Sequence, residues 1–205
     1  MAKNVFQVDL KKAPEDAAIK THNRWHPDIP MVETFKRGEV LRVECYDWTG
    51  GQIGNNDSAN DIRDVDLTRV HYLSGPFGFE GAEPGDLLVV DILDIGTLPE
   101  SQWGFNGLFA KENGGGFLTE HYPNATKSIW DFEGIYAKSR HVPGVRYPGL
   151  IHPGLIGCLP DHKLLAEANR REAALIATDP NRVPPLAAPP HAATALMGQM
   201  SASAA

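Results

Sequence analysis

The chain has 205 residues, and 19 Lys and Arg stand against 26 Asp and Glu, so its formal net charge at pH 7 is −7. That balance argues against an electrostatic grip on nucleic acid or on an anionic membrane. Two cysteines are too few for a disulfide framework or for a closed zinc site of their own. No apolar run approaches the roughly 20 residues of a spanning helix, and the first residues carry no secretory leader. We therefore expect a cytoplasmic protein.

Strand signals dominate the first half of the chain. In residues 39–46, Leu41, Val43 and Cys45 alternate with polar residues, which is typical of a half-buried strand. Residues 87–95 (LLVVDILDI) are almost continuously apolar and follow the sequence Glu-Pro-Gly-Asp, which places Pro and Gly where a type II turn requires them. Shorter strand candidates are residues 3–10, 70–73 and 77–79.

Helical signals are sparser. A short helix is expected to begin at Ser58, and the strongest helix runs from about Asp161 to Ala177, with Asp161 as its N-terminal cap and Glu167 four residues before Arg171. The Gly- and aromatic-rich stretch 100–150 reads as long loops with short strands. The pattern predicts a mainly β fold with one late helix. We expect residues 1–180 to form a β-rich unit and 181–205 a connector rich in Pro and Ala.

Polar residues crowd the loop that follows the strand ending at Tyr46. The segment 47–61 (DWTGGQIGNNDSAND) has two consecutive glycines, Gly50 and Gly51, that permit a sharp turn, and five Asp, Asn and Gln side chains in its first eleven positions. Ordinary turn chemistry explains such a loop as well as a site does, because Asn and Asp bond their own backbone. The eight histidines show no spacing diagnostic of zinc, and Cys158 in its apolar setting is expected to be a small buried residue.

An ordered series of segments resembles the acetamidase/formamidase family. In chain order the segments are Trp25-His26-Pro27, Gly38-Glu39-Val40, YDWTGGQI, DVDLTRVHYLSGP, EGAEPGDLLVVDILDI, PGLIHPGLIG and NRREAALI. Their order and spacing match along nearly the whole of residues 4–197. The Gly- and aromatic-rich insertion around 103–147 and the VPPLAAPP tail are more similar to the formamidase branch than to the acetamidases.

The resemblance implies a jelly-roll-like β-sandwich or barrel that forms homo-oligomers and hydrolyses a short aliphatic amide, formamide above all, to the acid and ammonia. It covers the N-terminal half of the family only. The family's second half carries a Gly-Gly-Asn-x-Asp segment and an Asp-x-His…Gly-Asp-Gly-Glu segment, neither of which occurs here. We therefore expect the partner of this chain to be a C-terminal half, in one polypeptide or as a second chain.

Amide hydrolysis requires an activated water, a group that stabilises the oxyanion and a proton donor for the leaving nitrogen. A divalent cation, zinc or calcium, would supply the first two. The residues to which we assign these roles are Asp47, Asp57 and His152 for catalysis, Gln52, Trp25 and Trp48 for substrate binding, and Asp57, His71 and His152 as metal ligands.

Three alternatives stay open. An acetamidase would have a slightly larger acyl pocket. A non-catalytic β-sandwich would present its aromatic residues to a ligand such as a sugar. A structural half would shape the pocket while a partner chain carries the chemistry.

Overall fold

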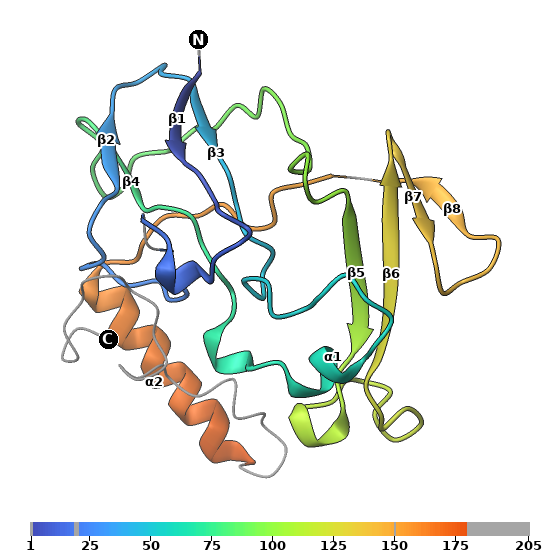
Figure 1. Cartoon of the computed structure of the whole chain (residues 1–205). Helices are drawn as coiled ribbons and strands as arrows, with labels where there is room; N and C mark the ends of the chain where they lie inside the picture. Colours follow the sequence, from blue (N-terminus) through green and yellow to red (C-terminus); the bar gives the residue numbers. More distant parts are fainter. Residues whose placement is uncertain (1, 19–20, 150, 180–205) are drawn as a thin grey trace. The chain divides into compact units, whose positions relative to one another are not determined.

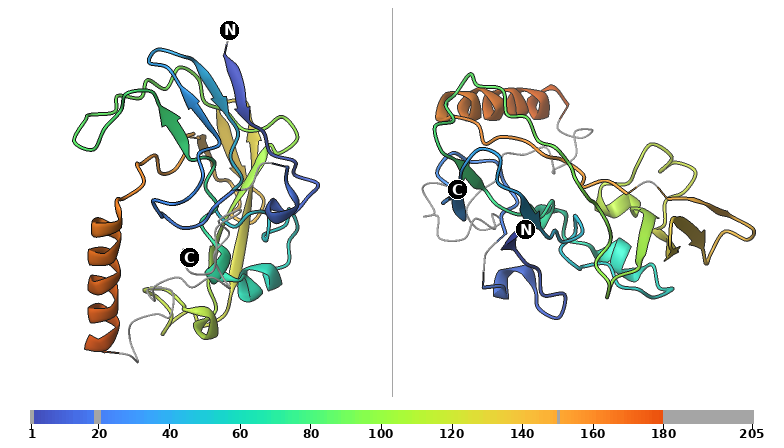
Figure 2. Two further views of the ribbon diagram at one scale, coloured as in Figure 1. Left: turned by 90° about the vertical axis from the view of Figure 1, so that its left-hand side faces the viewer. Right: turned by 90° about the horizontal axis from the view of Figure 1, so that it is seen from above.

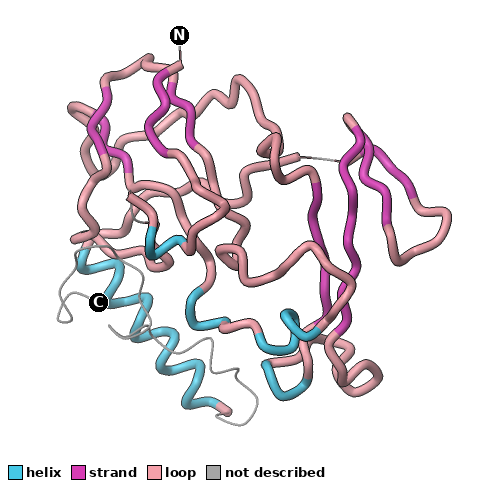
Figure 3. The backbone as a smooth tube through the Cα atoms, in the orientation of Figure 1, coloured by secondary structure: helices cyan, strands magenta, loops and turns pink. Residues whose placement is uncertain are grey.

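The computed structural model describes residues 2–18, 21–149 and 151–179, and the chain divides into two compact units. Unit 1 comprises Met1–Gly51, Leu67–Asp91 and Gly157–Ala205, and unit 2 comprises Gln52–Asp66 and Ile92–Ile156. Loops dominate the tube in Figure 3, with strands as short interruptions. The candidate connector 181–205 lies outside the described residues.

Unit 1 contains two small parallel sheets. Strand β1 (Lys3–Phe6) pairs with β3 (Leu41–Val43), and β2 (Glu33–Phe35) pairs with β4 (Phe77–Phe79). Short 3-10 helices lie at Pro14–Asp16 and Leu67–Arg69. The apolar core of this unit gathers side chains from many loops. Its buried apolar members are Val5, Phe6, Ala17, Ile29, Phe35, Tyr46, Val70 and Tyr72.

Helix α2 (His162–Thr178) is the one long helix among the described residues, and both views in Figure 2 draw it uninterrupted. Asp161 caps it as predicted, because its carboxylate accepts the N–H of Leu164 at 2.7 Å. The predicted Glu167–Arg171 pair forms at 2.9 Å, and Arg170 binds the same carboxylate. No α2 residue is buried, and its Leu164 and Leu175 side chains are 58 and 52% exposed.

Unit 2 is built on a four-stranded antiparallel sheet in the order β5-β6-β7-β8. The strands are β5 (Trp103–Leu108), β6 (Thr126–Glu133), β7 (Tyr136–Ser139) and β8 (Arg146–Pro148), and Figure 1 shows β5 and β6 as the two longest strands. Helix α1 (Asn60–Asp64) and a 3-10 helix (Lys111–Asn113) complete the unit. The buried apolar residues are Ile53, Ile62, Val65, Ala110, Ile129 and Ala137.

The predicted strand over residues 87–95 is wrong for this structure, because no described strand pairs with it. The turn before it is confirmed: Asp86 N donates to Glu83 O at 3.0 Å, and Gly85 has a φ of +105°. The 39–46 strand shrinks to β3, and residues 70–73 contribute only an isolated bridge between His22 and Leu73. Residues 77–79 form β4 as predicted.

Cys158 is exposed, as is Cys45, so the prediction of a small buried cysteine is wrong. The apolar neighbours that suggested burial are themselves exposed, with Leu155 at 80% and Ile156 at 58% of their full accessible surface. The mainly β class with one main helix is confirmed. Among the described residues, no helix combines the length and apolar character that crossing a membrane requires.

Candidate functional site

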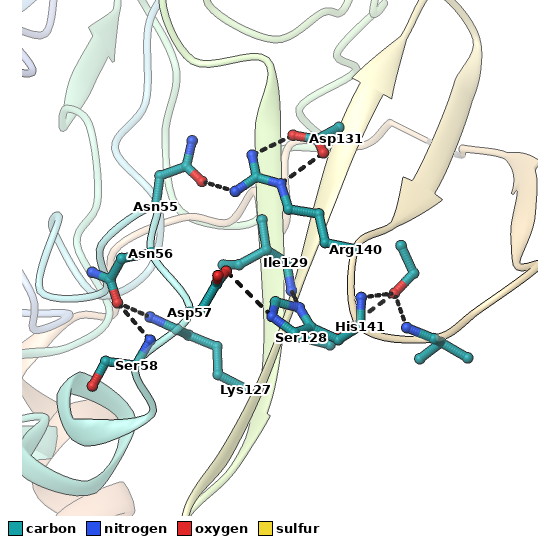
Figure 4. A network of polar contacts seen from close by, with 12 residues as sticks. Asn55, Asn56, Asp57, Ser58, Lys127, Ser128, Ile129, Asp131, Arg140 and His141 are labelled. Atoms are coloured by element: carbon teal, nitrogen blue, oxygen red, sulfur yellow. Dashed lines mark hydrogen bonds and ion pairs between the residues drawn. The ribbon is translucent and has the colours of Figure 1, made fainter.

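Asp57 and His141 form a carboxylate–imidazole pair in unit 2 (Figure 4). His141 Nε2 lies 3.3 Å from Asp57 Oδ1, and His141 Nδ1 accepts the backbone N–H of Ile129 at 3.0 Å. Because a backbone N–H always donates, Nδ1 of the neutral ring carries no proton, and the proton sits on Nε2 facing Asp57. The Asp57 side chain is 79% exposed and that of His141 is 30% exposed. The imidazole therefore lies beside a carboxylate that water and small molecules can reach.

A turn after β7 holds His141 in position. The Oγ of Ser139, a buried residue, accepts the N–H of His141 at 3.1 Å and that of Val142 at 2.8 Å. Ser139 Oγ also lies 3.2 Å from Ser128 Oγ across the sheet, and Arg140 N donates to Ile129 O at 3.0 Å. A hydroxyl bonded to the backbone two and three residues later fixes a turn. Arg140 and His141 are thereby held at the C-terminal end of β7.

The residue before Asp57 is held by a lysine from β6. Lys127 has a side chain only 1% exposed, and its ammonium lies 2.7 and 2.9 Å from the two carboxylate oxygens of Asp61. The same ammonium donates to Gly54 O and to Asn56 Oδ1, each at 3.1 Å. A buried ammonium requires partners for all its protons, and this one has them. The loop is consequently anchored to the sheet on both sides of Asn55.

The charge balance around Lys127 extends to Asp61. Partial burial acts to raise the pKa of the Asp61 carboxyl, but hydrogen bonds from Lys127 and from the Gly54 and Ile62 backbone lower it below its ordinary value. Asp61 is therefore ionised at neutral pH. An ionised, fully bonded pair of this kind is a structural anchor.

Arg140 holds the first residue of the same loop. Its guanidinium binds both carboxylate oxygens of Asp131, with Nε at 2.7 Å from Oδ2, and its Nη1 donates to Asn55 Oδ1 at 2.8 Å. Hydrogen bonding from Arg140 lowers the pKa of the Asp131 carboxyl. A guanidinium presents its donors in a planar fork, which suits binding a carboxylate and an amide oxygen at once.

Three successive loop residues are thus each held by a different basic side chain of unit 2, Asn55 by Arg140, Asn56 by Lys127 and Asp57 by His141 (Figure 4). We call Asn55, Asn56 and Asp57 the held loop. The sequence prediction found Asp57 but missed all three basic partners. Their signal was weak, since they lie 71, 84 and 85 residues away from the residues that they hold.

Asp47, another predicted catalytic residue, lies in unit 1 and closes its own turn. Its Oδ1 accepts the Thr49 N–H at 2.8 Å and the Thr49 hydroxyl at 2.5 Å, and its Oδ2 accepts the Gly51 N–H at 2.8 Å. Gly50 within the turn has a φ of +68°, and a Cβ there would stand 2.3 Å from the Tyr72 ring. These contacts match the turn interpretation of the polar loop.

The predicted substrate-binding residues have separate surroundings. Gln52 pairs with the Asp66 backbone through both ends of its amide, accepting the N–H at 2.8 Å and donating to the carbonyl at 3.2 Å. In unit 1, the Trp48 ring lies 5.2 Å from the ring of His71, so a predicted substrate residue and a predicted metal ligand do meet. Trp25 packs against Gly157, where a Cβ would come within 2.8 Å of the indole.

The proposed metal ligands are divided between the two units. His71 belongs to unit 1, whereas Asp57 and His152 belong to unit 2, and His152 is exposed with its Nδ1 accepting the Gly154 N–H at 3.1 Å. Across the residues that the structure describes, no three His, Cys, Asp or Glu side chains stand close enough to hold an ion.

Comparison with known proteins identifies the family. The model of the acetamidase/formamidase family matches residues 7–205. This chain belongs to that family. It is 68% identical over 203 residues to a formamidase of Methylophilus methylotrophus, covering 99% of this chain and 50% of the relative. It is 62% identical over 197 residues to an acetamidase of Mycolicibacterium smegmatis, covering 93% of this chain and 48% of the relative.

A solved structure has closely the same fold as this chain. A structure titled gamma lactamase from Delftia acidovorans superposes with a TM-score of 0.92 at 64% identity. It covers 98% of this chain and 49% of that one. The chain therefore spans about half the length of the relatives that it matches. We call the part of those relatives that it does not match the complementary half.

Proposed function

We propose that this chain forms part of an amide hydrolase that releases ammonia from a short aliphatic amide, with formamide as the preferred substrate. The observation that carries the proposal is the 68% identity, over 99% of the chain, to a formamidase. The other relatives support the reaction class, because an acetamidase and a γ-lactamase are both named for amides. A lactam is a cyclic amide, and opening it breaks the same kind of C–N bond.

Within this chain, the held loop supports Asp57 as the general base. In the proposed step, Asp57 accepts a proton from water while the water oxygen bonds to the amide carbon. The C–N bond then breaks as the nitrogen takes up a proton and leaves as ammonia. His141 acts as a positioning residue, since its Nε2 lies 3.3 Å from one carboxylate oxygen while its Nδ1 is occupied by the Ile129 N–H.

The exposure of Asp57 bears on how the site is completed. At 79% exposure, water competes for every contact that this carboxylate would make with a substrate. Water exclusion strengthens electrostatic interactions in an active site, and formamide offers almost no apolar surface for binding. We propose that the complementary half covers this surface and contributes further catalytic groups. The partner is the same polypeptide's other half or a separate chain.

Acetamide is the second candidate substrate, because the acetamidase of M. smegmatis is 62% identical to this chain. A methyl group discriminates only about 10- to 200-fold in an apolar pocket, so high identity alone does not separate the two substrates. A divalent cation stays a prediction, as do its assigned ligands Asp57, His71 and His152. Homo-oligomer formation and a cytoplasmic location stay predictions too, the latter supported by two free, exposed thiols.

Ammonia release tests the proposal. The 205-residue chain is assayed with formamide and with acetamide, alone and after co-expression with the complementary half of the M. methylotrophus formamidase. We expect release only from the assembled protein, with a larger kcat/KM for formamide. An assembled protein that releases no ammonia from either amide would support the ligand-binding alternative. Unchanged kcat on altering the held loop would support the structural-half alternative.

A further inference from the structure

Among the residues that the structure describes, the longest exposed apolar segment is residues 87–95. Leu87, Val89 and Leu93 are 88, 73 and 72% exposed, and the other apolar side chains of the segment are 38–56% exposed. Monomeric proteins rarely leave so continuous an apolar run in water. The boundary between the two units of the chain falls inside this segment, between Asp91 and Ile92.

The backbone of the segment is as unpartnered as its side chains. A hydrogen-bonded turn precedes it, with Asp86 N donating to Glu83 O, and another follows it, with Ser101 N donating to Leu98 O at 2.9 Å. Between these turns, no backbone hydrogen bond joins residues 87–95 to any other described residue. Figure 3 draws the whole stretch between β4 and β5 as loop. Peptide groups require partners once they are buried, so any surface that covers this segment has to supply them.

The exposure alternates in the manner of a strand. Between residues 87 and 93, the apolar side chains at 87, 89 and 93 are 72–88% exposed, whereas those at 88, 90 and 92 are 44–56% exposed; Ile95, at 38%, departs from the alternation. Side chains two residues apart share one face of a strand, so the odd-numbered face is the more open. Asp91 lies on that face between Val89 and Leu93. A partner surface is therefore apolar, with a cation or hydrogen-bond donor opposite Asp91.

We infer that residues 87–95 are a docking strand to which the complementary half adds a β-strand, burying the odd-numbered face. The relatives identify this occupant: a solved chain with the same fold, at a TM-score of 0.92, has about as much chain again, since the match covers 49% of it. Strand addition supplies the missing backbone hydrogen bonds, and the alternate side chains supply specificity. The inference rests on the complementary half that the proposed function invokes, and it gives that partner a place to bind.

Hydrogen exchange tests the inference without an activity assay. The probe is the complementary half of the M. methylotrophus formamidase, co-expressed with the full 205-residue chain. We expect the amides of residues 87–95 to exchange freely in the chain alone and at least about 100-fold more slowly in the complex. Free exchange in both states would overturn the inference. Protection in the chain alone, accompanied by self-association, would overturn it too and would assign the segment to a second copy.

Substitutions provide an independent test by co-purification. V89D combined with L93D places two carboxylates on the odd-numbered face, and we expect at least a tenfold loss of the co-purified complementary half. The matched control is I135D, in the turn between β6 and β7, where the isoleucine is 68% exposed, and it is expected to co-purify normally. All three side chains are exposed, so the folded chain tolerates them, as unchanged exchange of β5–β8 will show. Undiminished co-purification of V89D/L93D would contradict the inference. A complex that assembles yet releases no ammonia would contradict the proposed function alone.

Discussion

His141 Nε2 lies 3.3 Å from Asp57 Oδ1 while the opposite ring nitrogen accepts the Ile129 N–H at 3.0 Å. The backbone bond settles which nitrogen carries the proton and directs an N–H donor at an exposed carboxylate. Asp57 stands out from the other carboxylates of the held loop's surroundings on this ground. Asp61 is paired with Lys127, and Asp131 is paired with Arg140. Asp57 contacts His141 through Oδ1 and keeps its other carboxylate oxygen outside that contact.

If Asp57 is the base, D57N removes its ability to accept a proton while leaving the shape of the side chain. We expect kcat for formamide to fall by about 10²- to 10⁴-fold in the assembled protein, the usual contribution of general base catalysis. Thermal unfolding should be unaltered, because the side chain is 79% exposed. The matched control is D64N, an exposed aspartate on α1 that pairs with Arg63. Equal activity of D57N and D64N would remove Asp57 from the mechanism.

A positioning role for His141 predicts coupling with Asp57. H141N keeps an acceptor near the position of Nδ1 for the Ile129 N–H but loses the Nε2–H that faces Asp57. We expect its kcat to fall by about tenfold, and the double variant D57N/H141N to be no slower than D57N alone, because residues that act as a unit are not additive. The measurement is a double-mutant cycle on kcat. Multiplying effects would show that His141 acts independently of Asp57.

Lys127 is expected to stabilise unit 2. K127M leaves the Asp61 carboxylate without its cation, and breaking a buried ion pair by removing one partner costs about 3–5 kcal/mol. We expect a loss in unfolding free energy of about 3 kcal/mol, the lower end, because the Asp61 side chain is 18% exposed. Denaturant titration provides the measurement. K138M, at an exposed position of β7, is the control and should change stability by less than about 0.5 kcal/mol.

Restoring neutrality distinguishes an ion pair from simple packing. In K127M/D61N the unpaired charge is gone, so part of the lost stability should return. The alternative is that the losses in unfolding free energy of K127M and D61N simply add in the double variant. That result would show that the contacts to Gly54 and Asn56, rather than the charge pair, carry the effect.

Asp47 is predicted to act on stability. D47A removes three hydrogen bonds to a carboxylate that close the turn around Gly50, and we expect a loss of about 1.5–3 kcal/mol. Thermal unfolding checks this. The contacts of Asp47 lie within its own turn, so kcat per folded molecule should stay within about twofold, which corresponds to well under about 1.4 kcal/mol at the transition state. A large drop in kcat with unchanged stability would instead return Asp47 to the catalytic set.

Buried His22 makes stability depend on pH. Burial lowers its pKa below 6.5, against a smaller opposing effect of the Nδ1 contact with Arg24 O at 2.8 Å. The folded state disfavours the protonated ring. The contribution of neutral His22 to the unfolding free energy is therefore complete above pH 6.5 and is lost as the pH falls through the folded-state pKa. We expect H22Q to flatten the decline of unfolding free energy below pH 6.5, whereas H121Q, at an exposed site, should keep it. An identical slope in H22Q would refute the assignment.

Local features were predictable from the sequence. Helix α2 begins where Asp161 caps it, and the turn before residue 87 has Pro and Gly in the required places, because caps and turns depend on residues within four positions of one another. The loop containing Asp57 was recognisable as polar for the same reason. Its three basic partners were not, since strand register and a turn after β7 bring them from 71–85 residues away.

The strand predicted at residues 87–95 failed for the opposite reason. Its composition matches a buried strand, but a strand exists only with a neighbour, and the described residues provide none. The exposed apolar chain at 155–156 and the exposed Cys158 repeat this pattern. Hydrophobicity predicted burial correctly for many positions, yet it contains no information on which polypeptide provides the cover.

The kcat/KM for ammonia release from formamide, measured on the assembled protein with wild-type chain and with D57N, tests the central claim most directly. We predict release from formamide that exceeds release from acetamide, and at least a 100-fold loss in D57N with normal assembly. No release from formamide, or equal release by wild type and D57N, would contradict it.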